Sequence, residues 1–199
     1  MVENYKKFIT ELQNMIDADF AQQAPYIKCQ NGCAKCCQKG DYPFSTIELE
    51  FLKEEFVKLS PELQEQIKQK IKRLLHEKSQ SNVETFMHEC PFLINNSCSV
   101  YSNRGIICRT FGLIYYKPDG KMQIPFCAYD GLNYSEVLDL EKNIITQEKV
   151  DKAGYNIEPK SFNIHYDFVT ADNISSIYGF NYGKKGPLLE IIADDEFFA

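Results

Sequence analysis

The sequence lacks long hydrophobic runs and an excess of basic residues. No stretch approaches the roughly 18 consecutive apolar residues that suggest a membrane-spanning helix. The first residues, Met1 to Lys7, run straight into an amphipathic pattern and show neither the apolar core nor the cleavage site of a secretory signal. The formal net charge of −6 argues against a general nucleic-acid binder, whose surface is normally basic. We therefore expect a cytoplasmic protein that binds neither membranes nor nucleic acid.

The motifs of several enzyme classes are missing as well. Gly183-Lys-Lys-Gly186 does not fit the pattern of a phosphate-binding loop, and no Ser-His-Asp, Cys-His or paired-carboxylate arrangement stands out. The spacing Cys29-x3-Cys33-x2-Cys36 also occurs in radical S-adenosylmethionine enzymes, but the alternating strands and helices of their barrel are absent here. The sequence therefore assigns no catalytic residue, and it leaves open whether the protein is an enzyme.

What the sequence does contain is a set of eight cysteines. Four of them fall within nine residues, and none occurs in the last third of the chain. In a reducing compartment, such clustering indicates metal ligands rather than disulfides. Thiolates are soft, charged ligands that suit both zinc and iron–sulfur centres. The candidate metal ligands are Cys29, Cys33, Cys36, Cys37, Cys90, Cys98, Cys108 and Cys127.

The adjacent pair Cys36-Cys37 bears on the number of metal centres. Neighbouring side chains generally diverge, so both thiols could bind one metal only through a strained turn. We infer that the two cysteines face different partners. One alternative is a single centre with the remaining thiols buried around it. The other has two centres, one on Cys29, Cys33 and Cys36 and one around Cys37, Cys90 and Cys98, with Cys108 and Cys127 completing one each.

Helices are predicted in the N-terminal half of the chain. The apolar spacing of residues 3–20 is typical of an amphipathic helix. The stretch from Ser45 to Glu48 fits a capping box, in which Ser45 accepts from a free amide of the helix and Glu48 reaches back to the amide of Ser45. Ser60 and Pro61 begin a further helix, because proline is favoured at the first helical position.

Two hairpins are predicted in the middle of the chain. The first turns at Asn95-Asn96, since asparagine tolerates the positive φ of a tight turn. It would bring Cys90 and Cys98 close to each other across its strands. The second hairpin covers residues 113–126 and also contains typical turn residues.

These elements predict an α+β fold. We expect a predominantly helical single domain with small antiparallel β-hairpins around a cysteine-ligated metal centre. Residues 1–130 would form the N-terminal helix plus the cysteine-cluster metal-binding domain, and residues 131–199 a cysteine-free C-terminal extension packed on it. Helices are predicted in this extension over residues 134–153, 171–178 and 187–198.

The cysteine motifs together resemble a known family. They read Cys29-x3-Cys33-x2-Cys36-Cys37, Cys90-Pro-Phe-Leu, Cys98-x-x-Tyr101-x-x-Arg104-x3-Cys108-Arg109-x-Phe111 and Cys127. Between residues 26 and 130, this pattern resembles the CxxCxxCC, or YkgJ-like, family of zinc- or iron-chelating cysteine-cluster domains. The resemblance implies a bacterial metal-binding domain that holds an iron–sulfur cluster or zinc.

The function that the resemblance implies has two versions. A related cysteine cluster occurs in flagellin lysine methylases, where the resemblance implies an iron–sulfur centre. We favour this version, in which one or two centres transfer electrons or support a modification reaction with an unknown protein or redox partner. The alternative is a non-enzymatic module, in which structural zinc holds the fold and the surface binds another protein.

Two arginines flank Cys108 in this pattern. Four thiolates on a zinc ion leave a net charge of −2, so nearby cations help. We expect Arg104 and Arg109 to supply this positive charge next to the cysteine ligands without binding the metal themselves. The alternative is that each forms an ordinary salt bridge. The family usually has proline after the arginine that matches Arg104. This chain has Gly105 there, which predicts a looser start of the short helix that carries Cys108.

Overall fold

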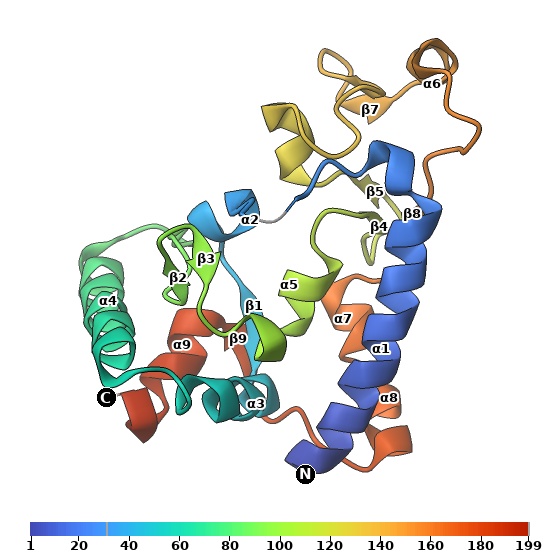
Figure 1. Cartoon of the computed structure of the whole chain (residues 1–199). Coiled ribbons are helices and arrows are strands. Elements are labelled where there is room, and N and C mark those ends of the chain that lie inside the picture. The colour runs from blue at the N-terminus through green and yellow to red at the C-terminus, as the bar shows by residue number, and fades with distance from the viewer. Residues whose placement is uncertain (31, 199) are drawn as a thin grey trace. The chain divides into compact units, whose positions relative to one another are not determined.

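The computed structural model describes residues 1–30 and 32–198 of the chain (Figure 1). These residues fall into two compact units, each built from segments that are distant in the sequence. Unit 1 contains Met1–Phe8, Gly32–Arg109 and Asp172–Ala199, and unit 2 contains Ile9–Asn31 and Thr110–Ala171. Helices and small sheets occur in both units, which confirms the α+β class. In the described part of the chain, no helix is long and apolar enough to cross a bilayer.

The predicted helix at the N-terminus is confirmed as α1 (Val2–Gln22). Its residues up to Phe8 belong to unit 1 and the rest belong to unit 2. The units are groups of residues in space, whereas the predicted domains 1–130 and 131–199 are consecutive stretches of sequence. That division of the chain stays a prediction.

Unit 1 has a helical core. Its main helices are α3 (Thr46–Phe56), α4 (Pro61–Gln80) and α9 (Leu188–Ala193). The predicted start of α4 is confirmed, because the Ser60 hydroxyl accepts a hydrogen bond from the Leu63 amide at 3.3 Å. Burying apolar side chains between these helices is the main source of their stability. The core includes Phe44, Leu49, Leu52, Phe56, Ile67, Ile71, Phe92, Leu188, Ile191 and Phe198.

Short elements complete unit 1. The strand β1 (Pro43–Ser45) pairs antiparallel with β9 (Lys185–Pro187), which joins two segments about 140 residues apart in the sequence. The other elements are α2 (Lys35–Gln38), β2 (Leu93–Ile94), β3 (Ser97–Cys98), the 3-10 helix η2 (Tyr101–Asn103), α5 (Ile106–Thr110), α8 (Asp172–Tyr178) and the 3-10 helix η4 (Glu196–Phe198).

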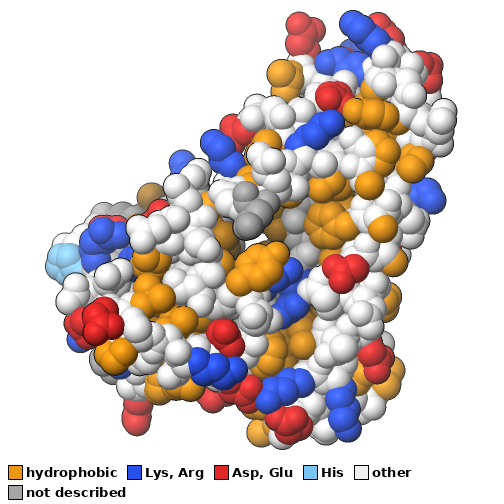
Figure 2. Space-filling view, viewed as in Figure 1, with side chains coloured by type: hydrophobic (Ala, Val, Ile, Leu, Met, Phe, Trp, Pro, Cys, Tyr) orange, Lys and Arg blue, Asp and Glu red, His pale blue; other side chains and the backbone are white. Residues whose placement is uncertain are grey.

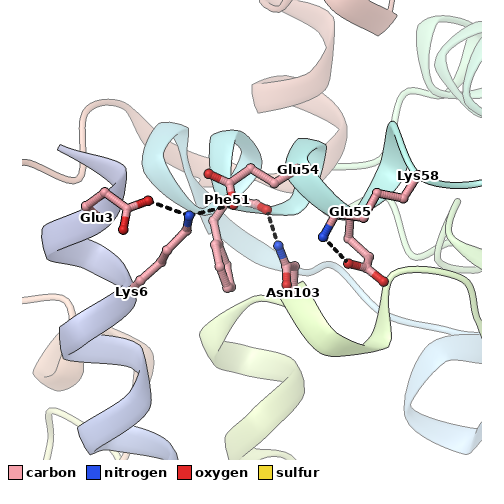
Figure 3. Close-up of polar contacts among 7 residues, drawn as sticks. All are labelled: Glu3, Lys6, Phe51, Glu54, Glu55, Lys58 and Asn103. Atoms are coloured by element: carbon pink, nitrogen blue, oxygen red, sulfur yellow. Dashed lines mark hydrogen bonds and ion pairs between the residues drawn. The ribbon is translucent and has the colours of Figure 1, made fainter.

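Helix α3 has polar contacts to two other segments of unit 1 (Figure 3). The ammonium of Lys6 on α1 lies 2.8 Å from the carboxylate of Glu54. The side-chain amide of Asn103 donates to the carbonyl of Phe51 at 2.7 Å and so ties η2 to the same helix. Because the Asn103 bond reaches a backbone carbonyl and is partly buried, it fixes the position of η2 better than an exposed ion pair would.

The capping box predicted at the start of α3 is wrong in its details. The Ser45 side chain makes no capping bond to a backbone amide. Its hydroxyl instead donates to the Glu48 carboxylate at 2.7 Å, and the other carboxylate oxygen accepts from the Ile106 amide at 2.8 Å. A distant amide has therefore replaced the local one, because Glu48 is fully buried against α5 and not exposed at the helix end.

Unit 2 contains the larger part of α1 together with short strands and short helices. In its main sheet, β4 (Ile114–Tyr116) pairs antiparallel with β5 (Met122–Gln123) and parallel with β8 (Ser161–Phe162). The β4–β5 pair confirms the second predicted hairpin. The remaining elements are η1 (Ala24–Tyr26), η3 (Phe126–Asp130), β6 (Leu138–Asp139), β7 (Ile144–Ile145), α6 (Gln147–Ala153) and α7 (Tyr166–Val169).

Buried polar groups and stacked rings hold unit 2 together. The rings of Tyr26 and Tyr134 stack with centroids 5.4 Å apart. Asn133 has no exposed surface, and its Oδ1 accepts from the amides of Lys28 and Cys29 at 2.8 and 3.1 Å. Its Nδ2 donates to the Gly112 carbonyl at 2.9 Å. One side chain therefore joins two loop amides and a loop carbonyl.

Two of the helices predicted in the C-terminal third are wrong in extent. Of residues 134–153, only α6 is helical, and β6 and β7 form a hairpin before it. Asp139 accepts from two following amides, Glu141 and Lys142, and Asn143 has a φ of 59°, so turn chemistry overrides the helical apolar pattern here. The helix predicted from Pro187 ends at Ala193, whereas α8 is confirmed with Gly179 at its end in the left-handed region.

Charged side chains of both signs are interspersed on the surface. On the face that Figure 2 shows, acidic and basic residues alternate between apolar side chains. The net charge of −6 is therefore not gathered into one acidic patch on this face.

Candidate metal centre

Cys36 and Cys37 lie on the short helix α2 of unit 1. The Cys37 carbonyl accepts the Cys90 amide at 2.8 Å, and Gly40 and His88 exchange two backbone hydrogen bonds just beyond. The segment after α2 is thereby aligned with the segment that leads to Cys90. Two parts of the chain more than 50 residues apart thus bring their thiols to the same region.

The hairpin β2–β3 brings in Cys98. Asn95 and Asn96 both have positive φ, at 50° and 59°, as the predicted tight turn requires, and Leu93 pairs with Cys98. The Cys90 carbonyl accepts from the Leu93 amide at 3.1 Å at the start of the hairpin. The first predicted hairpin is therefore confirmed, and it places Cys90 and Cys98 close enough for the charge of one to raise the pKa of the other.

Cys108 lies on α5, and the start of this helix is firmly held. Gly105 packs against the buried ring of Phe44, and a Cβ atom at Gly105 would lie 2.4 Å from that ring. The next amide, that of Ile106, is bound by Glu48. An aromatic ring therefore fills the space beside Gly105, and the looser start stays a prediction.

The thiols of these segments influence one another electrostatically. A hydrogen bond between the Cys36 and Cys37 sulfur atoms, 3.9 Å apart, lowers the pKa of Cys36 to about 7 and raises that of Cys37. Burial, together with the nearby Cys98, raises the pKa of Cys90 to about 12. Burial also raises the pKa of Cys108, with further contributions from Cys90 and Cys98. These five thiols therefore form one cluster in which each negative charge disfavours the next.

The adjacent cysteines do not diverge as the sequence led us to expect. Their Cβ atoms leave the helix in different directions, but rotation about χ1 lets the two sulfur atoms approach to 3.9 Å. This separation is close to the edge of a tetrahedron of sulfur atoms around zinc, about 3.8 Å for Zn–S bonds of about 2.3 Å. Both thiols can therefore serve one centre.

The two predicted arginines have different surroundings. The guanidinium of Arg104 lies over the ring of Tyr101 at 3.9 Å and opposes the burial that raises the pKa of Cys98. Arg109 is buried, and its guanidinium donates to the carbonyls of Ser102 and Arg104 at 2.9 and 3.0 Å. Arg104 thus acts by charge close to the thiols, whereas Arg109 holds the backbone that leads into α5.

The donor set fits zinc or iron in its chemistry but not yet in its geometry. Five thiols gather without forming a disulfide, and a bound cation would remove the mutual repulsion of their charged forms. Among the residues that the structure describes, however, no three Cys, His, Asp or Glu side chains are arranged so that they could hold one metal ion.

The remaining predicted ligands are placed differently. Cys33 is half-buried in unit 1, shortly before α2. Cys29 and Cys127 belong to unit 2, where Cys29 is exposed and Cys127 is buried. Their part in metal binding stays a prediction. Sequence reasoning missed Glu48 as a group close to this region, since its spacing matched a local capping motif.

Comparison with known proteins gives one match. The family model CxxCxxCC, described as "Putative zinc- or iron-chelating domain", matches residues 28–128. The matched range includes all eight cysteines. The name of the model has two residues between its first two cysteines, whereas this chain has three between Cys29 and Cys33. No curated protein and no solved structure matches the chain.

Proposed function

We propose, from the premise that this chain belongs to the CxxCxxCC family of zinc- or iron-chelating domains, that unit 1 binds metal through its clustered thiols. The observation that carries the proposal is that thiols from three separate segments come together: Cys37, Cys98 and Cys108 pack against the core that contains Cys90, and the Cys36 sulfur lies 3.9 Å from that of Cys37. Without a cation, the raised pKa values keep Cys37, Cys90, Cys98 and Cys108 protonated, and a bound cation would favour the thiolate forms that ligate metal.

We further propose that the metal is an iron–sulfur cluster that exchanges electrons with a protein partner. Unit 1 contains six cysteines, Cys33 included, which is more than the four thiolates that a single zinc site takes. When bound, an iron–sulfur cluster supplies one-electron chemistry. The protein would contribute burial of Cys90 and the positive charge of Arg104, both of which tune the electronics of such a centre.

A structural zinc site is the second candidate, and one distance favours it. The Cys36 and Cys37 sulfur atoms are 3.9 Å apart, which suits two ligands of the same metal ion. In a four-iron cluster each thiolate binds its own iron, which spreads the sulfur atoms farther apart. In this version the metal holds α2, the β2–β3 hairpin and α5 together, and the surface of unit 1 binds a partner.

Purification without oxygen distinguishes the two candidates. An iron–sulfur protein is brown and contains iron and acid-labile sulfide, whereas a zinc protein is colourless. Mass spectrometry after alkylation of the metal-loaded chain then identifies the ligands. We expect Cys36, Cys37, Cys90 and Cys108 to be protected and to react after metal removal.

The same measurement covers Cys29, Cys33, Cys98 and Cys127, since protection of any of them adds it to the ligand set. Cys108→Ser should release the metal, because binding at such sites depends on every thiolate. Full metal content in this variant would contradict the proposal.

A further inference from the structure

Glu48 is a charged residue in an unusual place. It has no exposed surface, although it is the third residue of α3, in the first turn of the helix. A buried carboxylate is costly unless hydrogen bonds satisfy it. Two of its bonds go to Ser45, on its own side, and to the amide of Ile106, 58 residues farther along the chain. The second bond links α3 to the first residue of α5.

The bond to Ile106 acts on the segment that carries Cys108. The first amides of a helix have no partner within the helix, and α5 is only five residues long, so few internal bonds hold it. Cys108 follows Ile106 by two residues. A shift of the Ile106 amide is therefore transmitted to the Cys108 thiol through half a helical turn.

The same face of α3 holds the other end of this segment. Glu48 and Phe51 are three residues apart and lie on one side of the helix. The backbone carbonyl of Phe51 accepts from the side-chain amide of Asn103 at 2.7 Å (Figure 3), while the carboxylate of Glu48 accepts from the backbone amide of Ile106. Arg104 lies between these two attachment points. The stretch from Asn103 to Ile106 is thus fixed at both ends by α3.

We propose that Glu48 is a positioning residue for the metal centre, which it never touches. Its carboxylate sets the start of α5, and thereby the place of the Cys108 thiol relative to Cys36, Cys37 and Cys90. The inference rests on the proposed function, because it assumes that Cys108 is a ligand. The inference adds to the proposed function that α3 holds one of the segments that carry the ligands.

Cobalt(II) binding to the full-length chain tests this inference. Cobalt reports ligand geometry through its visible absorption, which stays independent of stability once the folded chain is saturated with metal. Glu48→Ala should lower cobalt affinity about 10- to 100-fold, as loss of groups behind metal ligands typically does, and should change the spectrum at saturation. Glu48→Gln keeps an oxygen that accepts from Ile106, so it should restore most of the affinity and the wild-type spectrum.

Glu50→Gln is the matched control on the same helix. The Glu50 carboxylate is partly exposed and pairs with Lys53. The cobalt affinity and the visible spectrum of the Glu50→Gln variant should therefore equal those of the wild type. If Glu48→Ala does not fold, Ser45→Ala removes only one partner of Glu48 and should give a smaller spectral change of the same kind. A wild-type spectrum in every folded Glu48 or Ser45 variant would overturn the inference. Failure of the wild-type chain to bind cobalt, zinc or iron would instead refute the proposed function.

Discussion

The two units of this protein close their interiors in different ways. Unit 2 buries the amide of Asn133, whose oxygen and nitrogen are both hydrogen-bonded, with three bonds to loop backbone. Unit 1 instead brings together five thiols whose charged forms repel one another. A polar interior can thus be complete in itself, or it can need a ligand from outside the chain. Only the second kind makes stability depend on metal.

Metal removal should have the largest effect, and it should affect unit 1 but not unit 2. Chelation should lower the free energy of unfolding of unit 1 by several kcal/mol, because binding at a structural thiolate site also stabilises the fold. Hydrogen exchange measured by mass spectrometry should show faster exchange in α2, the β2–β3 hairpin and α5. The segments of unit 2 around Asn133 should keep their protection. Equal loss of protection in both units would contradict the distinction.

Asn133→Ala should have the next largest effect. It removes three hydrogen bonds of a side chain that has no exposed surface, at about 1 kcal/mol each. We expect unfolding in urea to show a loss of about 3 kcal/mol in both metal-loaded and metal-free protein. Asn82→Ala, in an exposed loop, is the control and should change little. A loss that appears only in the metal-loaded protein would mean that the interior of unit 2 also depends on metal.

Gly105→Ala should have the smallest effect of the three. Its new Cβ would lie 2.4 Å from the buried Phe44 ring, and such overpacking costs about 2 kcal/mol. Gly186→Ala is the matched control, because a Cβ there meets no atom closer than 3.7 Å. Thermal unfolding of the two variants should separate them. Equal melting temperatures would show that the start of α5 tolerates a side chain.

Local patterns were enough to predict much of unit 1. Ser60-Pro61 predicted the start of α4, and Asn95-Asn96 predicted the turn that both positive φ values confirm. These features depend on a few neighbouring residues, so the sequence contains the whole physical cause. The same approach failed over residues 134–146, where an apolar pattern resembled a helix but Asp139 and Asn143 form a turn.

Long-range contacts could not be predicted in this way. The pairing of β1 with β9 and the bonds of Asn133 join residues that no local pattern relates. Glu48 shows the problem most clearly, since its spacing from Ser45 fitted a capping box while its partner lies 58 residues away. Several acceptors and donors can satisfy a carboxylate, and only the packing of the chain selects one.

The sequence by itself determined which chemistry is available to this protein. Eight cysteines, their spacing and the two arginines beside Cys108 indicate a metal-chelating domain, because ligand softness is a property of the residues themselves. The tertiary structure alone decided which thiols gather: five from α2, the β2–β3 hairpin and α5, held in part by α3. Proximity in space depends on how distant segments pack. That packing results from many contacts acting together, so no local sequence pattern reveals it.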